Sequence, residues 1–160
     1  MPSKNPPTKR SQTSRSPSRD GVVQFSIFLR NKVGALLDVV KLLNEHSVQV
    51  LATSIEASAD TAIVRVVVSD PESVEGVFHI HNIPYSACAL IVVELIEAEK
   101  FGSMLAALLA AEVNIFGSYA LLTQPRGRSA LALHVEDNEC ATNVLRSSGF
   151  TILTQDDLSR

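Results

Sequence analysis

Histidine and cysteine are the residue types in this chain that most often bind metals, but their spacing does not favour a metal site. His79 and His81 lie two positions apart on a predicted helix, so they lack the i, i+4 relation of a helical zinc pair. His46 ends another predicted helix, where a cation is favoured by the helix dipole alone. His134 is predicted to point away from the helices. We therefore expect no metal ion and no cofactor.

Nucleophilic chemistry is not favoured either. No serine or cysteine lies in a nucleophile elbow, and no glycine-rich phosphate loop follows a predicted strand. Cys88 and Cys140 stand in unrelated sequence contexts, so we expect two half-buried free thiols and no disulfide. The chain is therefore predicted not to be an enzyme.

A loop over Asn31–Gly34 separates a predicted strand over 22–30 from a helix that runs to about His46. Asn31 is typical of a turn or a helix start, because its side chain can accept hydrogen bonds from exposed backbone N–H groups. Gly34 can adopt unusual backbone dihedrals or let another group approach the backbone closely. The helix carries an apolar stripe at three- and four-residue spacing, formed by Leu36, Val39, Val40 and Leu43.

Two strands, a helix and a further strand complete the first half of the pattern. Strands are predicted over 48–58 and 61–69, and the second is apolar on both faces, so both faces are expected to be covered. Asp70-Pro71 is a strong helix start, because an N-cap acceptor precedes a residue suited to the first turn. That helix is predicted to end near Asn82, before a short strand over 83–88.

The second half repeats this order of elements. Its predicted elements are a strand, a helix, two strands, a helix and a strand, over 90–96, 101–111, 113–122, 129–136, 137–148 and 150–154. The copies match in detail: 65 residues separate Leu36 from Phe101, and 67 separate Asp70 from Asp137. The predicted fold is therefore α+β, with two tandem ferredoxin-like βαββαβ units that have antiparallel sheets, over 21–88 and 89–160.

Composition divides the chain into a basic start and an acidic body. Five positive charges precede Asp20, which leaves nine basic and seventeen acidic residues in the rest, a net charge of about −8. Residues 1–20 are rich in Ser, Pro, Lys and Arg, so we expect a disordered basic tail. No apolar run is long enough for a membrane span or a signal peptide, so no membrane association and a cytoplasmic location are expected.

The order of elements in both copies resembles the ACT domain, a small regulatory module that binds amino acids. The segment 29–36 (Leu-Arg-Asn-Lys-Val-Gly-Ala-Leu), the helix that follows it and Val48-Gln49-Val50 are similar to the first half of an ACT domain. Glu94-Leu95 and the segment from Phe101 to Ile115 are similar to a second copy. The resemblance covers Gly21 to about Thr154 and is closest to stand-alone proteins made of two ACT domains.

The resemblance implies an effector site at the first helix start. In that family, backbone amides of the loop after the first strand help to bind an amino acid, usually across an interface with the second strand of a neighbouring copy. Matched by position, the candidate residues are Asn31, Lys32, Val33, Gly34, Ala35 and Leu36, with Val33 where the family has a proline. Ser118 and Tyr119, on the second copy's second strand, are the expected opposite wall.

The second copy departs further from the family pattern. Ile96, Glu97, Ala98 and Glu99 take the places of Asn31 to Gly34, with neither the proline nor the glycine. Two glutamates at this position would repel a ligand carboxylate. We therefore expect at most one effector loop in each chain.

Three classes of function follow. The first is a non-catalytic sensor that binds a small effector, an amino acid, at an ACT–ACT interface. The alternative is a ligand-free structural module that dimerises or docks on a metabolic enzyme; the apolar strand 61–69 would support a homodimer through the open sheet face. Nucleic-acid binding is not expected, because the body is acidic and the strands 61–69 and 129–136 contain no aromatic residue.

Overall fold

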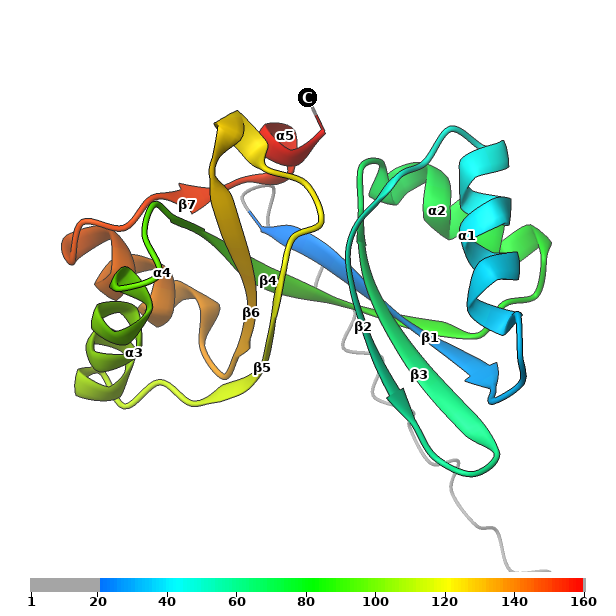
Figure 1. The fold of residues 1–160 in the computed structure, drawn as a ribbon, viewed down its shortest axis with the longest axis horizontal. Helices are drawn as coiled ribbons and strands as arrows, with labels where there is room; N and C mark the ends of the chain where they lie inside the picture. Colours follow the sequence, from blue (N-terminus) through cyan, green and yellow to red (C-terminus); the bar gives the residue numbers. More distant parts are fainter. Residues whose placement is uncertain (1–20, 160) are drawn as a thin grey trace, which may run out of the picture.

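The first unit of the computed structural model has the predicted order of elements (Figure 1). The structure describes residues 21–159, so the predicted basic tail over 1–20 lies outside the described residues. The elements of this unit are β1 (Val22–Arg30), α1 (Ala35–Glu45), β2 (Val50–Ala57), β3 (Thr61–Val68), α2 (Pro71–Ile80) and β4 (Tyr85–Leu95).

The second unit repeats the plan and adds a short helix at its end. Its elements are α3 (Lys100–Ala110), β5 (Ile115–Ala120), the 3-10 turn η1 (Pro125–Gly127), β6 (Ser129–Val135), α4 (Asn138–Ser147), β7 (Ile152–Leu153) and α5 (Gln155–Leu158). The fold class predicted from the sequence, α+β with two βαββαβ units and antiparallel pairing, is confirmed. Helix α5 was not predicted; Thr154 and Asp157 form a capping box at its start.

Strand β4 belongs to both units. Its first half, Tyr85–Leu90, pairs antiparallel with β1, and its second half, Ile91–Leu95, pairs with β6. The sequence predicted two strands here, over 83–88 and 90–96, but nothing between them breaks the extended backbone. Within residues 21–159 the strands therefore form one seven-stranded sheet in the order β2-β3-β1-β4-β6-β5, with β7 beside β4. The predicted boundary between 88 and 89 falls inside this strand.

Helices cover the two outer sides of the molecule, and the strands lie between them. Figure 1 shows α1 and α2 outside one half of the sheet and α3 and α4 outside the other half. One apolar core lies under each helix pair, and a third lies between the two halves of the sheet. Along β4 the side chains alternate between cores: Leu90 and Val92 lie in the central core, Ile91 and Val93 under α3 and α4.

The central core is closed where the two ends of the sheet meet. Ala52 in β2 forms an isolated antiparallel bridge with Leu121, and the Leu122 N–H donates to the Leu51 carbonyl at 2.7 Å. A β-bulge in β2 between Val50 and Ala52 lies beside this contact, a second bulge lies near the start of β5 between Ile115 and Gly117, and bulges increase local twist. The sheet therefore curls until its first and last strands touch.

This closure covers part of the sheet face through which a homodimer was expected. The second face of β3, represented by Val67, packs in the central core against the second unit of the same chain. That core includes Leu90, Val92 and Leu153 from the second unit. The chain itself therefore covers this face of β3 at Val67, whereas at the hairpin end Ile63 is only partly buried and its paired neighbour Phe28 is 46% exposed.

A hydrogen bond from Tyr119 to Gln24 joins β5 to β1 inside the closed interface. The Tyr119 hydroxyl donates to Gln24 Oε1 at 2.7 Å, and Gln24 is almost completely buried. Burial raises the pKa of the Tyr119 phenol, with a further contribution from Cys88, so the hydroxyl stays protonated and can donate.

Tyr119→Phe removes this donor and leaves a buried amide oxygen without a partner. We expect a loss of about 1–2 kcal/mol in the free energy of unfolding, measured by urea denaturation. Tyr85→Phe is the matched control, because the Tyr85 hydroxyl makes no hydrogen bond with any described residue. Equal losses for the two variants would contradict the role given to the Tyr119 bond.

The start of α2 provides a second test. The Asp70 carboxylate accepts from the Ser73 hydroxyl and, at 3.2 Å, from the Ser73 N–H, and these hydrogen bonds lower the pKa of Asp70. A carboxyl with a depressed folded-state pKa contributes stability above its unfolded pKa and loses it as the pH falls through the folded value. Asp70→Ala should therefore cost about 1 kcal/mol at pH 7 and progressively less below about pH 4. Chemical denaturation at several pH values measures this; a cost that stays constant down to pH 2 would contradict it.

Candidate functional site

The loop between β1 and α1 is held by Asn31. Its side-chain Nδ2 donates to the Ser58 carbonyl at 2.7 Å, and its backbone N–H donates to the Asp60 carbonyl at 3.0 Å. Both acceptors lie in the turn between β2 and β3. Asn31 is therefore not the N-cap of α1, as a helix-start role would require; it ties the loop to the neighbouring hairpin, and its Oδ1 receives no hydrogen bond from a described residue.

Helix α1 begins without a side-chain cap. Its N-cap is Gly34, which has φ 88° and ψ −11° in the left-handed region that favours glycine. Among the described residues, the backbone N–H groups of Leu36 and Leu37 have no hydrogen-bond acceptor. Such free N–H groups at a helix start carry partial positive charge and suit a carboxylate.

An apolar groove begins at this helix start and runs between α1 and the β2–β3 hairpin. Its volume is about 520 Å³. The floor is the part of the sheet that α1 leaves uncovered, and the walls come from α1 and β2. The residues that line it are Leu29, Arg30, Asn31, Lys32, Gly34, Ala35, Leu36, Leu37, Val40, Ile55, Ala57, Ala62 and Val64. Arg30 and Lys32 are the charged residues among them, and both are positive, although the body of the protein is acidic.

A second hollow, of about 400 Å³, continues the groove along α1. The two hollows share Leu36 and Val40 in their linings. The second one ends among Asn44, Thr53 and Leu122, and the Thr53 hydroxyl is buried there without a hydrogen-bond partner among the described residues. The groove therefore becomes more polar with distance from the helix start.

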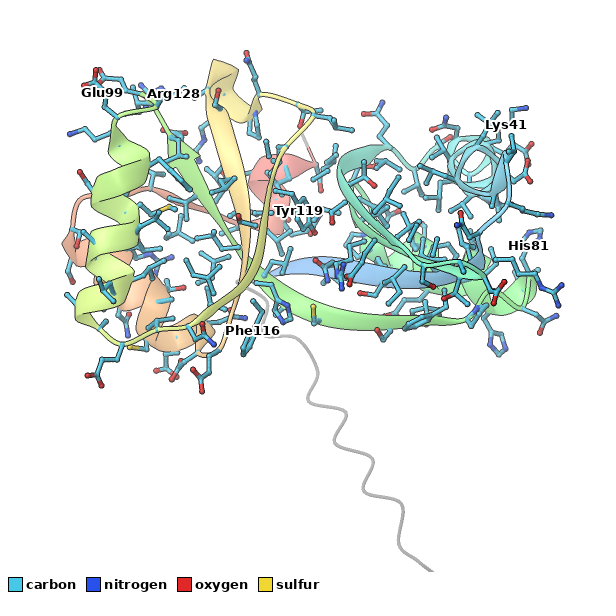
Figure 2. All side chains as sticks on the ribbon, turned by 60° about the horizontal axis from the view of Figure 1, so that its bottom comes forward. Lys41, His81, Glu99, Phe116, Tyr119 and Arg128 are labelled. Carbon is cyan, nitrogen blue, oxygen red and sulfur yellow. The ribbon has the colours of Figure 1, made fainter. Side chains whose placement is uncertain are left out.

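The structure brings together five of the eight residues predicted for the site. Asn31, Lys32, Gly34, Ala35 and Leu36 line the groove, whereas the Val33 side chain is fully exposed outside it. Ser118 and Tyr119 do not line the groove within one chain: Ser118 is exposed on β5, and Tyr119 lies in the interface between the units (Figure 2). If these two residues form a wall, it must belong to another copy.

The second unit has no equivalent of this groove start. Its helix α3 begins after Glu99, which has ordinary helical dihedrals (φ −64°), and Glu97 and Glu99 flank the helix start. Arg128 lies at the same end of the unit as Glu99 (Figure 2) and pairs with the buried Glu94 carboxylate at 2.8 Å. A hollow beside α3, lined by Lys100, Ser103 and Phe150 among others, has a volume of about 200 Å³.

The hairpin side of the groove and the contact between His46 and His81 were not predicted from the sequence. Ile55, Ala57, Ala62 and Val64 line the groove because of the β2–β3 pairing register, which leaves no local signal in the sequence. His46 and His81 end α1 and α2, with ring centroids 6.3 Å apart. No group of three or more metal-ligand side chains is present in the described part of the chain.

The duplicated βαββαβ units with a shared strand define a tandem ferredoxin-like fold. A family model described as "ACT domain pair" matches residues 21–160. The chain therefore belongs to the ACT domain pair family.

Solved structures have the same fold. Protein BT0572 from Bacteroides thetaiotaomicron is similar over 89% of this chain and 99% of its own, with a TM-score of 0.80 and 23% identity. The ligand-free regulatory subunit of aspartate kinase from Thermus thermophilus is similar over 81% of this chain and 93% of its own, with a TM-score of 0.54 and 13% identity. Among curated proteins no significant match was found. None of the described helices has the length and apolar character needed to cross a membrane.

The left-handed backbone at Gly34 predicts that an alanine substitution has opposite effects on stability at Gly34 and at Gly76. A Cβ at Gly34 would meet no atom within 4 Å, so Gly34→Ala should destabilise through its positive φ alone, by about 1 kcal/mol. Gly76→Ala makes the same chemical change inside α2, where it should stabilise by about 0.5–1 kcal/mol. Thermal or urea unfolding compares the two variants; the same sign for both would contradict the backbone argument.

Proposed function

We propose that this protein is a non-catalytic sensor that binds an amino acid in the groove at the start of α1. One observation carries the proposal: an uncapped helix start with free N–H groups opens into an apolar groove whose charged residues are all positive. The ACT domain pair family, to which the chain belongs, supports a regulatory role for such a groove.

The ligand's carboxylate would lie at the helix start. The free N–H groups of Leu36 and Leu37 are hydrogen-bond donors, and the macrodipole of α1 adds partial positive charge. Lys32 adds a full positive charge beside them. The remaining Oδ1 of Asn31 is a suitable acceptor for the ligand's ammonium group, because the amide nitrogen of Asn31 is already bonded to Ser58.

A second copy of the chain would cover the groove. The groove is open to solvent, and Leu37 and Ile55 on its rim are each about half exposed, while Val33 beside it is fully exposed. Burying these side chains would favour association. A homodimer would place the exposed Ser118 of one chain opposite the loop of another, whereas Tyr119 stays bonded to Gln24 inside its own chain.

The protein would act on a partner and not on a substrate. Two of the similar structures are regulatory subunits of aspartate kinase, from Thermus thermophilus and Thermus flavus. A protein made of a regulatory domain pair needs an effector and a target to regulate. We therefore propose a metabolic enzyme as the regulated partner, bound by the chain in an effector-dependent way.

A ligand-free interaction module is the second candidate, and one observation favours it. Helix α3 has no charged side chain between Lys100 and Glu112. It exposes Phe101, Leu105 and Leu109, which follow one line along the helix at four-residue spacing. A helix that is apolar on both its buried and its exposed side is suited to packing against another protein.

An amino acid that binds the native state should raise the melting temperature. At a ligand concentration one hundred times Kd, the expected increase is about 5–10 °C for a chain of this size. A thermal-shift panel of the twenty amino acids measures it. If none of them raises the melting temperature, the sensor proposal fails and the interaction module is favoured.

Gly34→Asp places a carboxylate beside the groove start and should abolish this shift. Aspartate tolerates the left-handed backbone better than most residues, so the variant is expected to fold. Gly76→Asp is the control, because it adds the same charge on the exposed side of α2 and should keep the ligand response. Equal responses of the two variants would place the ligand elsewhere.

A further inference from the structure

We infer that the effector is an amino acid with a branched aliphatic side chain. The inference rests on the proposed function and concerns the part of the ligand that lies beyond its carboxylate and ammonium groups. The groove residues next to the helix start determine which ligand side chain fits, because the side chain of a ligand anchored at the helix start lies against them.

Beyond Arg30, Asn31 and Lys32 at the helix start, the groove is lined by hydrocarbon. Leu36 and Val40 form the wall on α1, Ile55 forms the wall on β2, and Leu29 and Val64 lie in the floor. Leu29 and Leu36 also pack against the core under α1 and α2, so the groove opens onto the edge of that core. An aliphatic side chain placed here would extend the core and remove apolar surface from water.

Two alanines make the depression in the floor. Ala57 and Ala62 face each other across the β2–β3 pairing and line the groove together. Larger residues at these two positions would fill the space beside the Ile55–Val64 pair, which is the next pair on the same face. A short branched side chain suits this depression, because the depression is broad close to the strand pair and is bounded by the β-branched residues Ile55 and Val64.

The same lining disfavours other side chains. The lining contains no acidic residue, so the ammonium group of a lysine ligand would have no counter-charge in this part of the groove. A hydroxyl or amide placed against Leu36, Ile55 and Val64 would lose its hydrogen bonds to water without replacement. The unpartnered Thr53 hydroxyl lies in the second hollow, beyond the reach of a short side chain.

The positive charge at one end of the groove determines which end of such a ligand lies there, namely its carboxylate. Arg30 and Lys32 are the charged residues of the lining, and they lie at the end of the groove where α1 begins. The groove thus has a positive end and an apolar body, which matches an aliphatic amino acid whose carboxylate points to the helix start. In a chain whose body carries a net charge of about −8, this arrangement is a local exception.

Isosteric pairs of amino acids test the inference by isothermal titration calorimetry of the full chain. Valine and threonine have nearly the same shape, but threonine has a hydroxyl where valine has a second methyl group. We expect threonine to bind about 10- to 100-fold more weakly than valine, and asparagine similarly more weakly than leucine. Threonine or asparagine binding as tightly as its aliphatic counterpart would overturn the aliphatic assignment while leaving the sensor proposal intact.

Filling the depression tests its location. Ala57→Leu places extra methyl groups beside the Ile55–Val64 pair and should weaken valine binding at least tenfold without removing any polar group. Ala120→Leu is the matched control, because Ala120 is an exposed alanine on β5 outside the groove, and this variant should bind valine normally. Circular dichroism and the melting temperature without ligand show that both variants fold.

The outcomes separate the two proposals. Binding of valine, isoleucine or leucine that is lost in Ala57→Leu and kept in Ala120→Leu supports both. Tight binding of a polar or charged amino acid that Gly34→Asp abolishes supports the sensor and overturns the aliphatic assignment. Absence of binding by any amino acid overturns the sensor and, with it, the inference that depends on it.

Discussion

The structure depends on one extended strand that two units share. Strand β4 pairs with β1 over its first half and with β6 over its second half, and its side chains alternate between two different cores. A strand can satisfy both units only if its apolar residues are continuous, which explains the run from Leu90 to Val93. Neither unit has a complete sheet without this strand. The two units are therefore one folding unit in energetic terms, whatever their origin as repeats.

Sharing β4 determines which surfaces are left for function. The two halves of the sheet face each other across the central core, so the residues of that core are not available to a ligand or a partner. The helices cover most of the outer faces. What remains in the first unit is the edge where α1 does not reach over β2 and β3, and the groove lies there. In the second unit, the outer surface of α3 is apolar: Phe101, Leu105 and Leu109 are exposed there, and the helix has no charged side chain between Lys100 and Glu112.

The fold was largely predictable because the hydrophobic spacing occurs twice, and helices α1 to α4 and most strands were found from it. The division at 88/89 was drawn inside β4, since no local signal shows that two predicted strands are one. The offset between the two copies is not constant. It is 65 residues at the first helix of each unit, but Phe25 and Ile91, which take equivalent places in the two cores, are 66 residues apart. The loop side of the groove was predicted from a local pattern at Asn31 and Gly34. Its hairpin side was not, because Ala57 and Ala62 are brought together only by long-range pairing.

The divergence of the two loops follows from this physical arrangement. A duplicated unit keeps its core residues because both copies must fold around β4, but the loop before the first helix of each unit contributes nothing to the central core. In the first unit, Asn31 ties that loop to the hairpin and Gly34 leaves the helix start uncapped, so backbone N–H groups remain free. In the second unit, Glu97 and Glu99 place negative charge at the same point. The free donors of one unit and the repelling carboxylates of the other make the pair asymmetric in chemistry while it stays symmetric in fold. The two helix starts therefore differ in the charge of the residues beside them.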